Sequence, residues 1–329
     1  MQLVNEGSYC SIFKLVKSND IIAVKVIKKT EYSPLILKEK CLLSELSCKN
    51  IVNLKLCNLG DFDNANYFCM EYIDGGNLAD VIHSSDNIYT KNEALNWILQ
   101  ISNALLYLAE ALEPPVAHLD IKPENFLIKS DLKCLKLCDF NTCHYGDIQV
   151  FLMGTVPYRD PQIIMYTNKE YKSESLLHLD IYSFAVVIIE LTTRKCPLKD
   201  IFSEIMLITE HLVAPDILKS MVESNITERI TIKNLCQQFQ QYIPSSNNES
   251  GLRDIIEFPD KKKSILTPIE VLESKWKSQE TRATYLEYKE TNNRLKIKLK
   301  KQLKQISSKM DIDQQNLLLF LYSINKNNF

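Results

Sequence analysis

Val116-Ala117-His118-Leu119-Asp120-Ile121-Lys122-Pro123-Glu124-Asn125 is the stretch of this sequence that says most about its fold. It follows a long helical pattern and places a carboxylate (Asp120), an ammonium (Lys122) and a carboxamide (Asn125) on one short loop. A carboxylate can orient an attacking hydroxyl and receive its proton, an ammonium can neutralise a migrating phosphoryl group, and a carboxamide oxygen can bind a metal ion. The stretch therefore predicts a loop built for phosphoryl transfer.

A second acidic motif follows shortly afterwards. Asp139-Phe140-Asn141 comes directly after the strand-like run Leu135-Lys136-Leu137-Cys138. Magnesium prefers hard oxygen ligands and takes one or two of them from protein and the remainder from phosphates and water. Asn125 and Asp139 are therefore the predicted metal ligands.

The residues before this loop predict two regions of different secondary structure. The first is strand-rich and contains one helix, which opens at Ser33-Pro34; its strands are expected at Ser11–Val16, Ile21–Lys28, Ile51–Leu56 and Tyr67–Tyr72. The breaker cluster Asp74-Gly75-Gly76-Asn77 then separates it from a helical region. In the helical region, Thr90 and Glu93 have capping-box spacing before a helix over Ala94–Leu112, and Asp180–Leu191 predicts a helix that is apolar nearly all round.

Taken together and in this order, these motifs resemble the eukaryotic protein kinase superfamily, Ser/Thr type, from about Leu3 to about Gln240. Ala23-Val24-Lys25 matches the strand that carries the phosphate-binding Lys, and Glu39 matches its helical ion-pair partner. The resemblance implies an α+β, bilobal protein-kinase fold, with a β-rich N-lobe containing one helix over residues 1–73 and a mainly α-helical C-lobe over 74–243.

The resemblance also implies a function, which is ATP-dependent phosphorylation of Ser/Thr hydroxyls on protein substrates. Asp120 would be the catalytic base, Lys122 the transition-state cation, and Asn125 and Asp139 the Mg²⁺ ligands. Lys25, held by Glu39, would bind the ATP phosphates. The rest of the ATP site would be formed by the loop glycine, the apolar residues around the adenine and the hinge: Val4, Gly7, Ile12, Ala23, Met70, Glu71, Ile73 and Leu127.

The phosphate-binding loop departs from the family pattern, because Gly7 is the only one of its three glycines. Asn5 and Cys10 replace the others, and Cys10 is expected to keep the backbone away from the phosphates. Leu119 replaces the Arg that usually pairs with a phosphorylated activation segment. These departures keep an alternative open, a pseudokinase scaffold that binds nucleotide or partners without efficient phosphotransfer.

Two further departures lie in the activation segment. Asn141 replaces a Gly and is expected to tolerate a left-handed backbone there. Asp160-Pro161-Gln162 replaces Ala-Pro-Glu, so Arg229 is expected to have at best a neutral amide partner in Gln162. The segment from Asp139 to Gln162 is accordingly expected to be looser than in most family members.

The C-terminal part lies outside the resemblance. Residues 244–266 read as a polar linker and 267–329 as a helical tail, in which Arg294–Leu303 is basic and amphipathic. Three interpretations remain open: a coiled-coil or docking helix that allows self-association, a helix packed on the kinase domain, and a surface for anionic lipid, nucleic acid or a calmodulin-like partner.

Composition narrows the class of protein. The 329 residues carry a formal net charge of −2 and are 45% hydrophobic, which excludes disorder throughout and gives no overall attraction to nucleic acid. The ten cysteines contain no C-x-x-C pair, and no apolar run in the sequence is long enough to cross a bilayer, so a cytoplasmic or nuclear location is expected. Because Met1 lies inside the expected first strand, that strand is expected to be short or the sequence truncated.

Overall fold

The computed structural model describes residues 1–7, 9–17, 20–56, 66–145, 148–149, 154–161, 170–171, 173–197, 201, 205, 208, 212–241 and 255–256. Contacts divide the chain into two units, Met1–Pro259 and Asp260–Phe329. All described residues belong to the first unit. The predicted helical tail over 267–329, including Arg294–Leu303, lies outside them.

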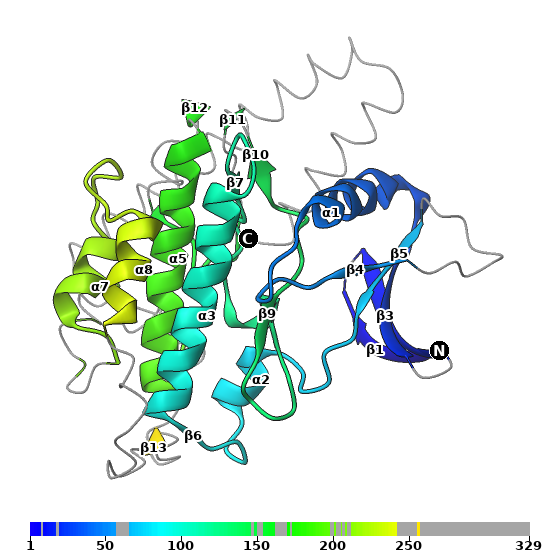
Figure 1. Cartoon of the computed structure of the whole chain (residues 1–329), viewed down its shortest axis with the longest axis horizontal. Coiled ribbons are helices and arrows are strands. Elements are labelled where there is room, and N and C mark those ends of the chain that lie inside the picture. The colour runs from blue at the N-terminus through cyan, green and yellow to red at the C-terminus, as the bar shows by residue number, and fades with distance from the viewer. Residues whose placement is uncertain are drawn as a thin grey trace, which may run out of the picture. The chain divides into compact units, whose positions relative to one another are not determined.

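The N-lobe is a five-stranded antiparallel sheet in the order β1-β2-β3-β5-β4 (Figure 1). Its strands are β1 (Gln2–Glu6), β2 (Cys10–Lys17), β3 (Asp20–Ile27), β4 (Leu54–Lys55) and β5 (Tyr67–Glu71). Side chains alternate between its two faces: Ala23 and Met70 join the main core, whereas Val24 and Cys69 lie in a second cluster on the opposite face. The strands expected at Ser11–Val16 and Ile21–Lys28 are confirmed as β2 and β3, which form an antiparallel hairpin with Lys17 opposite Asp20.

Helix α1 (Ser33–Glu45) follows the short 3-10 helix η1 (Thr30–Tyr32) and begins with Pro34 in its first turn, as predicted. Its buried residues are Ile36, Glu39, Leu42 and Leu43, which share one helical face, so the sequence places a carboxylate on the face turned toward the core. The strand expected over Ile51–Leu56 is shorter than predicted. Ile51 instead bridges Leu137 of the C-lobe, and the amide of Val52 donates to the carbonyl of Leu137.

The C-lobe is built around two long helices that Figure 1 shows side by side, α3 (Lys91–Glu110) and α5 (Ser173–Thr193). The predicted capping box of α3 is confirmed, because Thr90 and Glu93 each accept from the other's backbone amide. Helix α5 is longer than the predicted Asp180–Leu191. By length and composition, Ser175–Thr193 could cross a membrane, yet 78% of its most apolar window is buried inside the domain, as in a core helix.

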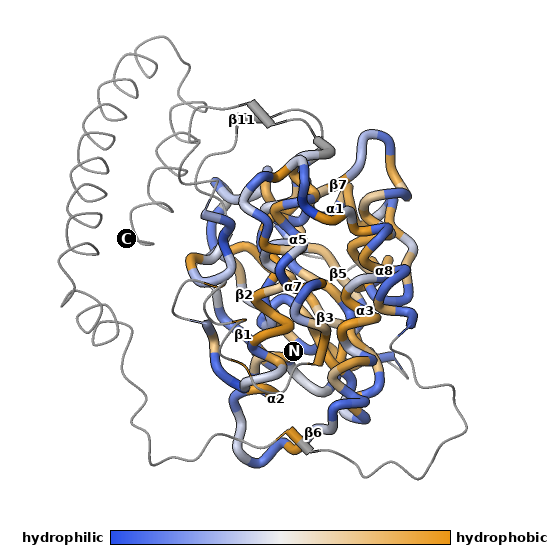
Figure 2. The backbone as a smooth tube through the Cα atoms, turned by 90° about the vertical axis from the view of Figure 1, so that its left-hand side faces the viewer, coloured by the Kyte–Doolittle hydropathy of each residue, from blue (hydrophilic) through white to orange (hydrophobic). Residues whose placement is uncertain are grey.

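Two shorter helices, α7 (Pro215–Met221) and α8 (Ile232–Gln240), complete the helical part. Phe184 of α5 meets Phe239 of α8 edge to face at 5.9 Å. Figure 2 shows the hydrophobic positions running along the helices and strands of the domain, with hydrophilic positions concentrated on the connecting turns. Burial of these apolar faces is the main stabilising contribution to the lobe.

Short elements between α1 and α5 carry the site. They are α2 (Leu78–His83), β6 (Tyr89–Thr90), β7 (Val116–Ala117), the 3-10 helix η2 (Pro123–Asn125), β8 (Phe126–Ile128), β9 (Leu135–Leu137), β10 (His144–Tyr145), β11 (Ile148–Gln149) and β12 (Glu170–Tyr171). Strand β7 pairs with β10, β8 with β9, and β11 with β12. Because Asn125 immediately precedes β8 and Asp139 follows β9, this hairpin brings the two predicted metal ligands to one end.

Two residues of the predicted linker form a strand. β13 (Ile255–Ile256) pairs antiparallel with β6 at the base of the C-lobe. Most of the predicted linker is outside the described residues, and the predicted boundaries at residues 73, 243 and 266 stay predictions.

Candidate active site

Lys25 joins the two lobes through its ammonium group. Its Nζ lies 2.6 Å from Oε2 of Glu39 on α1 and 2.8 Å from Oδ1 of Asp139 beyond β9. Glu39 also accepts from the backbone amide of Phe140 through Oε1, at 3.1 Å. The predicted Lys25–Glu39 pair is therefore formed, and it orients the start of the Asp139-Phe140-Asn141 motif.

Burial and charge act in opposite directions on this triad. Burial alone would lower the pKa of Lys25, but the carboxylates of Asp139 and Glu39 outweigh it and raise that pKa well above its usual value. Burial raises the pKa of Glu39, while Lys25 opposes that effect. Burial also works to raise the pKa of Asp139, but the Lys25 ammonium prevails and holds it below its usual value. Asp139 is thus an anion beside a fixed cation.

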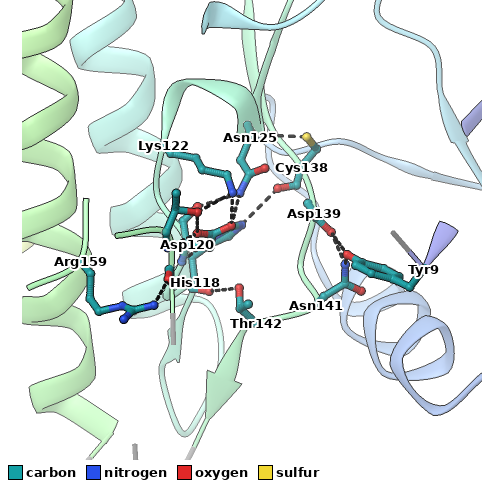
Figure 3. Close-up of polar contacts among 12 residues, drawn as sticks. Tyr9, His118, Asp120, Lys122, Asn125, Cys138, Asp139, Asn141, Thr142 and Arg159 are labelled. Atoms are coloured by element: carbon teal, nitrogen blue, oxygen red, sulfur yellow. Dashed lines mark hydrogen bonds and ion pairs between the residues drawn. The ribbon is translucent and has the colours of Figure 1, made fainter. Parts of the chain in front are cut away.

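The catalytic-loop residues lie within hydrogen-bond reach of one another (Figure 3). Nζ of Lys122 is 2.7 Å from Oδ2 of Asp120, and Nδ2 of Asn125 donates both to that oxygen at 3.0 Å and to the Asp120 carbonyl at 2.7 Å. Thr155 adds a hydroxyl: its Oγ1 donates to Oδ1 of Asp120 at 2.8 Å and accepts from Lys122 at 2.7 Å. Asp120 and Lys122 together therefore hold a hydroxyl group.

The carboxylate of Asp180 on α5 binds the backbone of the catalytic loop. Its carboxylate accepts from the backbone amides of His118 and Leu119 at 2.6 and 2.7 Å. Burial raises the pKa of Asp180 to about 7, although the two amides act to lower it. Leu119 has φ = 65° and packs against Leu176 and Leu179, so an apolar side chain occupies the position before Asp120.

The backbone of the Asp139-Phe140-Asn141 motif does not require a left-handed conformation at Asn141. The left-handed residue is Asp139, with φ = 64°, whereas Asn141 is absent from the positive-φ residues of the described chain. Phe140 is fully buried and meets His118 edge to face, with 5.1 Å between the ring centroids. The replacement of Gly by Asn is therefore compatible with ordinary backbone geometry.

Asn125 and Asp139 fit a magnesium ion by the chemistry of their oxygens. Asn125 makes both of its hydrogen bonds to Asp120 through Nδ2. Its carboxamide oxygen Oδ1 is therefore turned away from Asp120. Asp139 offers a carboxylate that Lys25 keeps ionised. Hard oxygens of this kind, supplemented by phosphate and water, are what Mg²⁺ takes from proteins.

Most of the predicted adenine-site residues share one apolar region. Ala23 and Met70 are paired neighbours on β3 and β5, and Ile12 and Leu127 pack against the core to which they belong. Ile73 is also buried. The other three predicted residues lie outside this apolar region, and their contact with ATP stays a prediction. Val4 on the edge strand β1 is 49% exposed, Gly7 lies in the turn after β1 with its amide bound to the Cys10 carbonyl, and the Glu71 carboxylate binds Lys136 at 2.6 Å.

Tyr9 is a site residue that sequence reasoning missed. Its hydroxyl lies 3.4 Å from Oδ1 of Asp139 and accepts from Asn141, and its ring centroid is 5.9 Å from Nζ of Lys25 (Figure 3). Burial raises the pKa of Tyr9, so the phenol stays neutral. Its place at the tip of the altered loop, between Gly7 and Cys10, was the signal that could have identified it.

The prediction that Arg229 has at best a neutral amide as its partner is wrong. Arg229 is paired with the carboxylate of Asp160, whose Oδ2 lies 2.5 Å from Nη1. The prediction considered only Gln162, which lies outside the described residues, and not the acidic residue two positions earlier in the sequence.

Comparison with known proteins agrees with this geometry. A family model described as "Protein kinase domain" matches residues 1–243, about three quarters of the chain. This chain belongs to the protein kinase family. Its recognised features are thus those of a protein kinase domain, including the bilobal fold and the Lys25–Glu39 pair.

Several curated relatives are kinases. "Putative mitogen-activated protein kinase kinase kinase 7-like" of Drosophila melanogaster is 31% identical over 207 residues, which cover 60% of this chain and 49% of the relative. "Mitogen-activated protein kinase kinase kinase 7" of Homo sapiens is 27% identical over 237 residues, covering 69% and 37%. "Wall-associated receptor kinase-like 1" of Arabidopsis thaliana is 28% identical over 242 residues, covering 70% and 31%. The protein kinase domain described here thus matches half or less of each relative's length.

Proposed function

We propose that this protein kinase domain transfers the γ-phosphoryl group of ATP to Ser/Thr hydroxyls on protein substrates. The observation that carries the proposal is the position of Nζ of Lys25 between Glu39 and Asp139, at 2.6 and 2.8 Å. In protein kinases the Lys–Glu pair and the metal-binding Asp must both be in place for phosphoryl transfer. In this chain the Lys25 ammonium contacts both Glu39 and the predicted metal ligand Asp139.

The chain's own residues would act on the substrate hydroxyl as follows. Mg-ATP, when bound, supplies the phosphoryl group and a divalent cation. Asp120 orients the attacking hydroxyl and receives its proton, and Lys122 neutralises negative charge that develops on the transferred group. Asn125 and Asp139 hold the metal, and Lys25 holds the nucleotide phosphates. The contact of the Thr155 hydroxyl with Asp120 and Lys122 supports the first of these roles, because it demonstrates that the two groups can hold a hydroxyl between them.

Ser/Thr specificity is part of the proposal. Lys122 two residues after Asp120, with Pro123-Glu124-Asn125 following, resembles the Ser/Thr branch of the family. We further propose a cytoplasmic or nuclear location and a tail that binds a partner or a second copy.

A pseudokinase scaffold is the second candidate, and a specific observation favours it. Besides Lys25, Oδ1 of Asp139 accepts from Tyr9 and Asn141, so two further protein donors occupy an oxygen of a predicted metal ligand. A chain that kept this arrangement would bind Mg-ATP poorly and turn over slowly.

Two measurements on the full chain separate these candidates. The first is binding of a fluorescent ATP analogue with and without Mg²⁺, and the second is phosphate transfer to a mixture of Ser, Thr and Tyr peptides followed by phosphoamino-acid analysis. The proposed kinase binds the analogue and yields phosphoserine and phosphothreonine. Absence of transfer, whether the analogue binds weakly or well, identifies the scaffold, and phosphotyrosine alone contradicts the specificity.

A further inference from the structure

The base of the C-lobe holds an extended segment from beyond the matched kinase domain. Ile255 and Ile256 of β13 pair with Thr90 and Tyr89 of β6, which leads directly into α3. The family match ends at residue 243, so this strand is an addition to the matched domain. The contact is independent of ATP and of the catalytic residues.

Arg194 completes the contact from the other side. It lies just after α5, with φ = 55°, and is almost wholly buried. Its guanidinium donates to the carbonyl of Ile256 at 3.2 Å and stacks over the ring of Tyr89 with 4.7 Å from Cζ to the centroid. It also donates to backbone carbonyls around the end of α2, among them those of Val81, Ile82, Ser84 and Asn87.

These contacts suit a peptide segment in an extended conformation that carries one buried apolar side chain. Arg194 and the edge of β6 both bind main-chain groups, and addition of a strand to an exposed edge is a general mode of peptide recognition. Selectivity comes from Ile256, which is 8% exposed and belongs to the main hydrophobic core. A buried guanidinium also needs acceptors for its donors, which the Ile256 carbonyl helps to supply.

The sequence around the strand favours this chain's own segment as the occupant. Ile255 and Ile256 stand between the polar run Ser245–Gly251 and the charged run Asp260–Lys263, in a short stretch that also contains Leu252 and Phe258, so an apolar segment is flanked by polar sequence on both sides. A segment tethered to the same domain by a short connection is present at a high effective concentration, in the millimolar range for flexible linkers. A weak peptide contact is then occupied nearly all the time.

We propose that Arg194 and the edge of β6 form a docking groove for extended peptide backbone, and that its occupant is the Ile255–Ile256 segment of the same chain. The groove anchors the residues that follow the kinase domain to the C-lobe. The anchoring is reversible, because it rests on two strand residues and one guanidinium rather than on a large buried surface.

The test uses a labelled synthetic peptide of residues 252–259 and three full-length chains. In Ile256→Glu the anchor is replaced by a charge, which vacates the groove. Ile88→Glu is the matched control, because Ile88 lies next to β6 but is 63% exposed. We expect the Ile256→Glu chain to bind the peptide at least about ten-fold more tightly than wild type or Ile88→Glu, because the segment in cis no longer competes. A peptide carrying the same Ile256→Glu change should not bind.

Equal binding by the wild-type and Ile256→Glu chains, measured by fluorescence anisotropy, would overturn the proposal. So would a wild-type chain that elutes as a dimer which Ile256→Glu converts to a monomer, because the occupant would then be a second copy. Circular dichroism establishes that each chain is folded. If Ile256→Glu does not fold, the milder Ile256→Ser replaces it with the same expected direction.

Discussion

Oδ2 of Asp160 lies 2.5 Å from Nη1 of Arg229, and both side chains are almost wholly buried. Arg229 also donates to the carbonyls of His178 and Glu223, and its guanidinium lies over the ring of Tyr182. The pair therefore ties the end of the segment around Thr155 to the helical part of the C-lobe. Removing one partner of such a buried ion pair lowers the stability of the fold strongly, because the remaining charge is left buried without a counter-ion or water around it.

Asp160→Asn should destabilise the domain by about 3 kcal/mol, since it leaves the Arg229 charge buried without a compensating anion. Urea denaturation measures the change. Asp216→Asn is the control, because Asp216 pairs with Lys219 at an exposed position and its loss should leave the urea midpoint nearly unchanged. Equal midpoints for Asp160→Asn and wild type would show that the pair is dispensable.

Activity should not require phosphate on the activation segment. Leu119 packs against Leu176 and Leu179 where the family usually has an Arg that pairs with such a phosphate. Phosphatase treatment should therefore change the rate of peptide phosphorylation less than about two-fold, since no cation is supplied at this position. A large loss of rate that is restored by rephosphorylation of Thr142, Tyr145 or Thr155 would refute this expectation.

Removing the Tyr9 hydroxyl or the Asn141 carboxamide should tighten nucleotide binding. Both groups contact Oδ1 of Asp139, and a hydrogen bond worth about 1 kcal/mol corresponds to roughly a five-fold change in the population of the competent state. Tyr9→Phe and Asn141→Gly should each lower the Kd of Mg-ATP by about that factor, as measured by titration calorimetry. Tyr107→Phe removes a hydroxyl that binds the Ser47 amide and is the control. Weaker binding by Tyr9→Phe would mean that the phenol helps to hold the nucleotide.

Stability should depend on pH through His83. Its Nε2 lies 2.8 Å from Oε1 of the buried Glu190, and this hydrogen bond raises the pKa of His83, with Glu124 acting in the same direction and Arg194 against it. Because the folded state holds the proton more tightly, the stabilisation is complete below about pH 6.5 and is lost as pH rises through the raised pKa.

The size of that effect is limited because the His83 side chain is 45% exposed, so it should stay below about 1 kcal/mol. The measurement compares the unfolding free energy of wild type and His83→Gln between about pH 6 and pH 9. The difference should shrink as pH rises. A difference that is constant over this range would exclude a charged His83–Glu190 pair.

Local sequence patterns were sufficient to predict much of the fold. The β2–β3 hairpin, the capping box of α3 and the Pro-initiated α1 are governed by neighbouring residues, and each was confirmed. The Lys25–Glu39 pair was reached through the family resemblance. It could be transferred because the strand and the helical face that carry it were both recognisable.

Contacts between distant residues explain what the sequence could not predict. Asp160 and Arg229 are 69 positions apart, and only the fold determines which acidic or amide group meets the guanidinium. Leu119 and Asp139 both have a left-handed backbone conformation; Asp adopts it more readily than most residues, whereas Leu rarely does, so at Leu119 the surrounding contacts of the folded loop must impose it. The pairing of Ile255–Ile256 with β6 depends likewise on an edge that only the folded lobe presents.

The most direct test of the account is phosphate transfer by Asp120→Asn. Asp120 receives bonds from Lys122, Asn125 and Thr155, and the substitution retains its size while removing its charge and its capacity as a base. Radiolabelled phosphate transfer from Mg-ATP to a Ser/Thr peptide is measured for the full-length wild type and variant, with thermal melting to verify folding. The account predicts clear transfer by wild type and a loss of about a hundred-fold or more in the folded variant. Transfer by Asp120→Asn at the wild-type rate would contradict it.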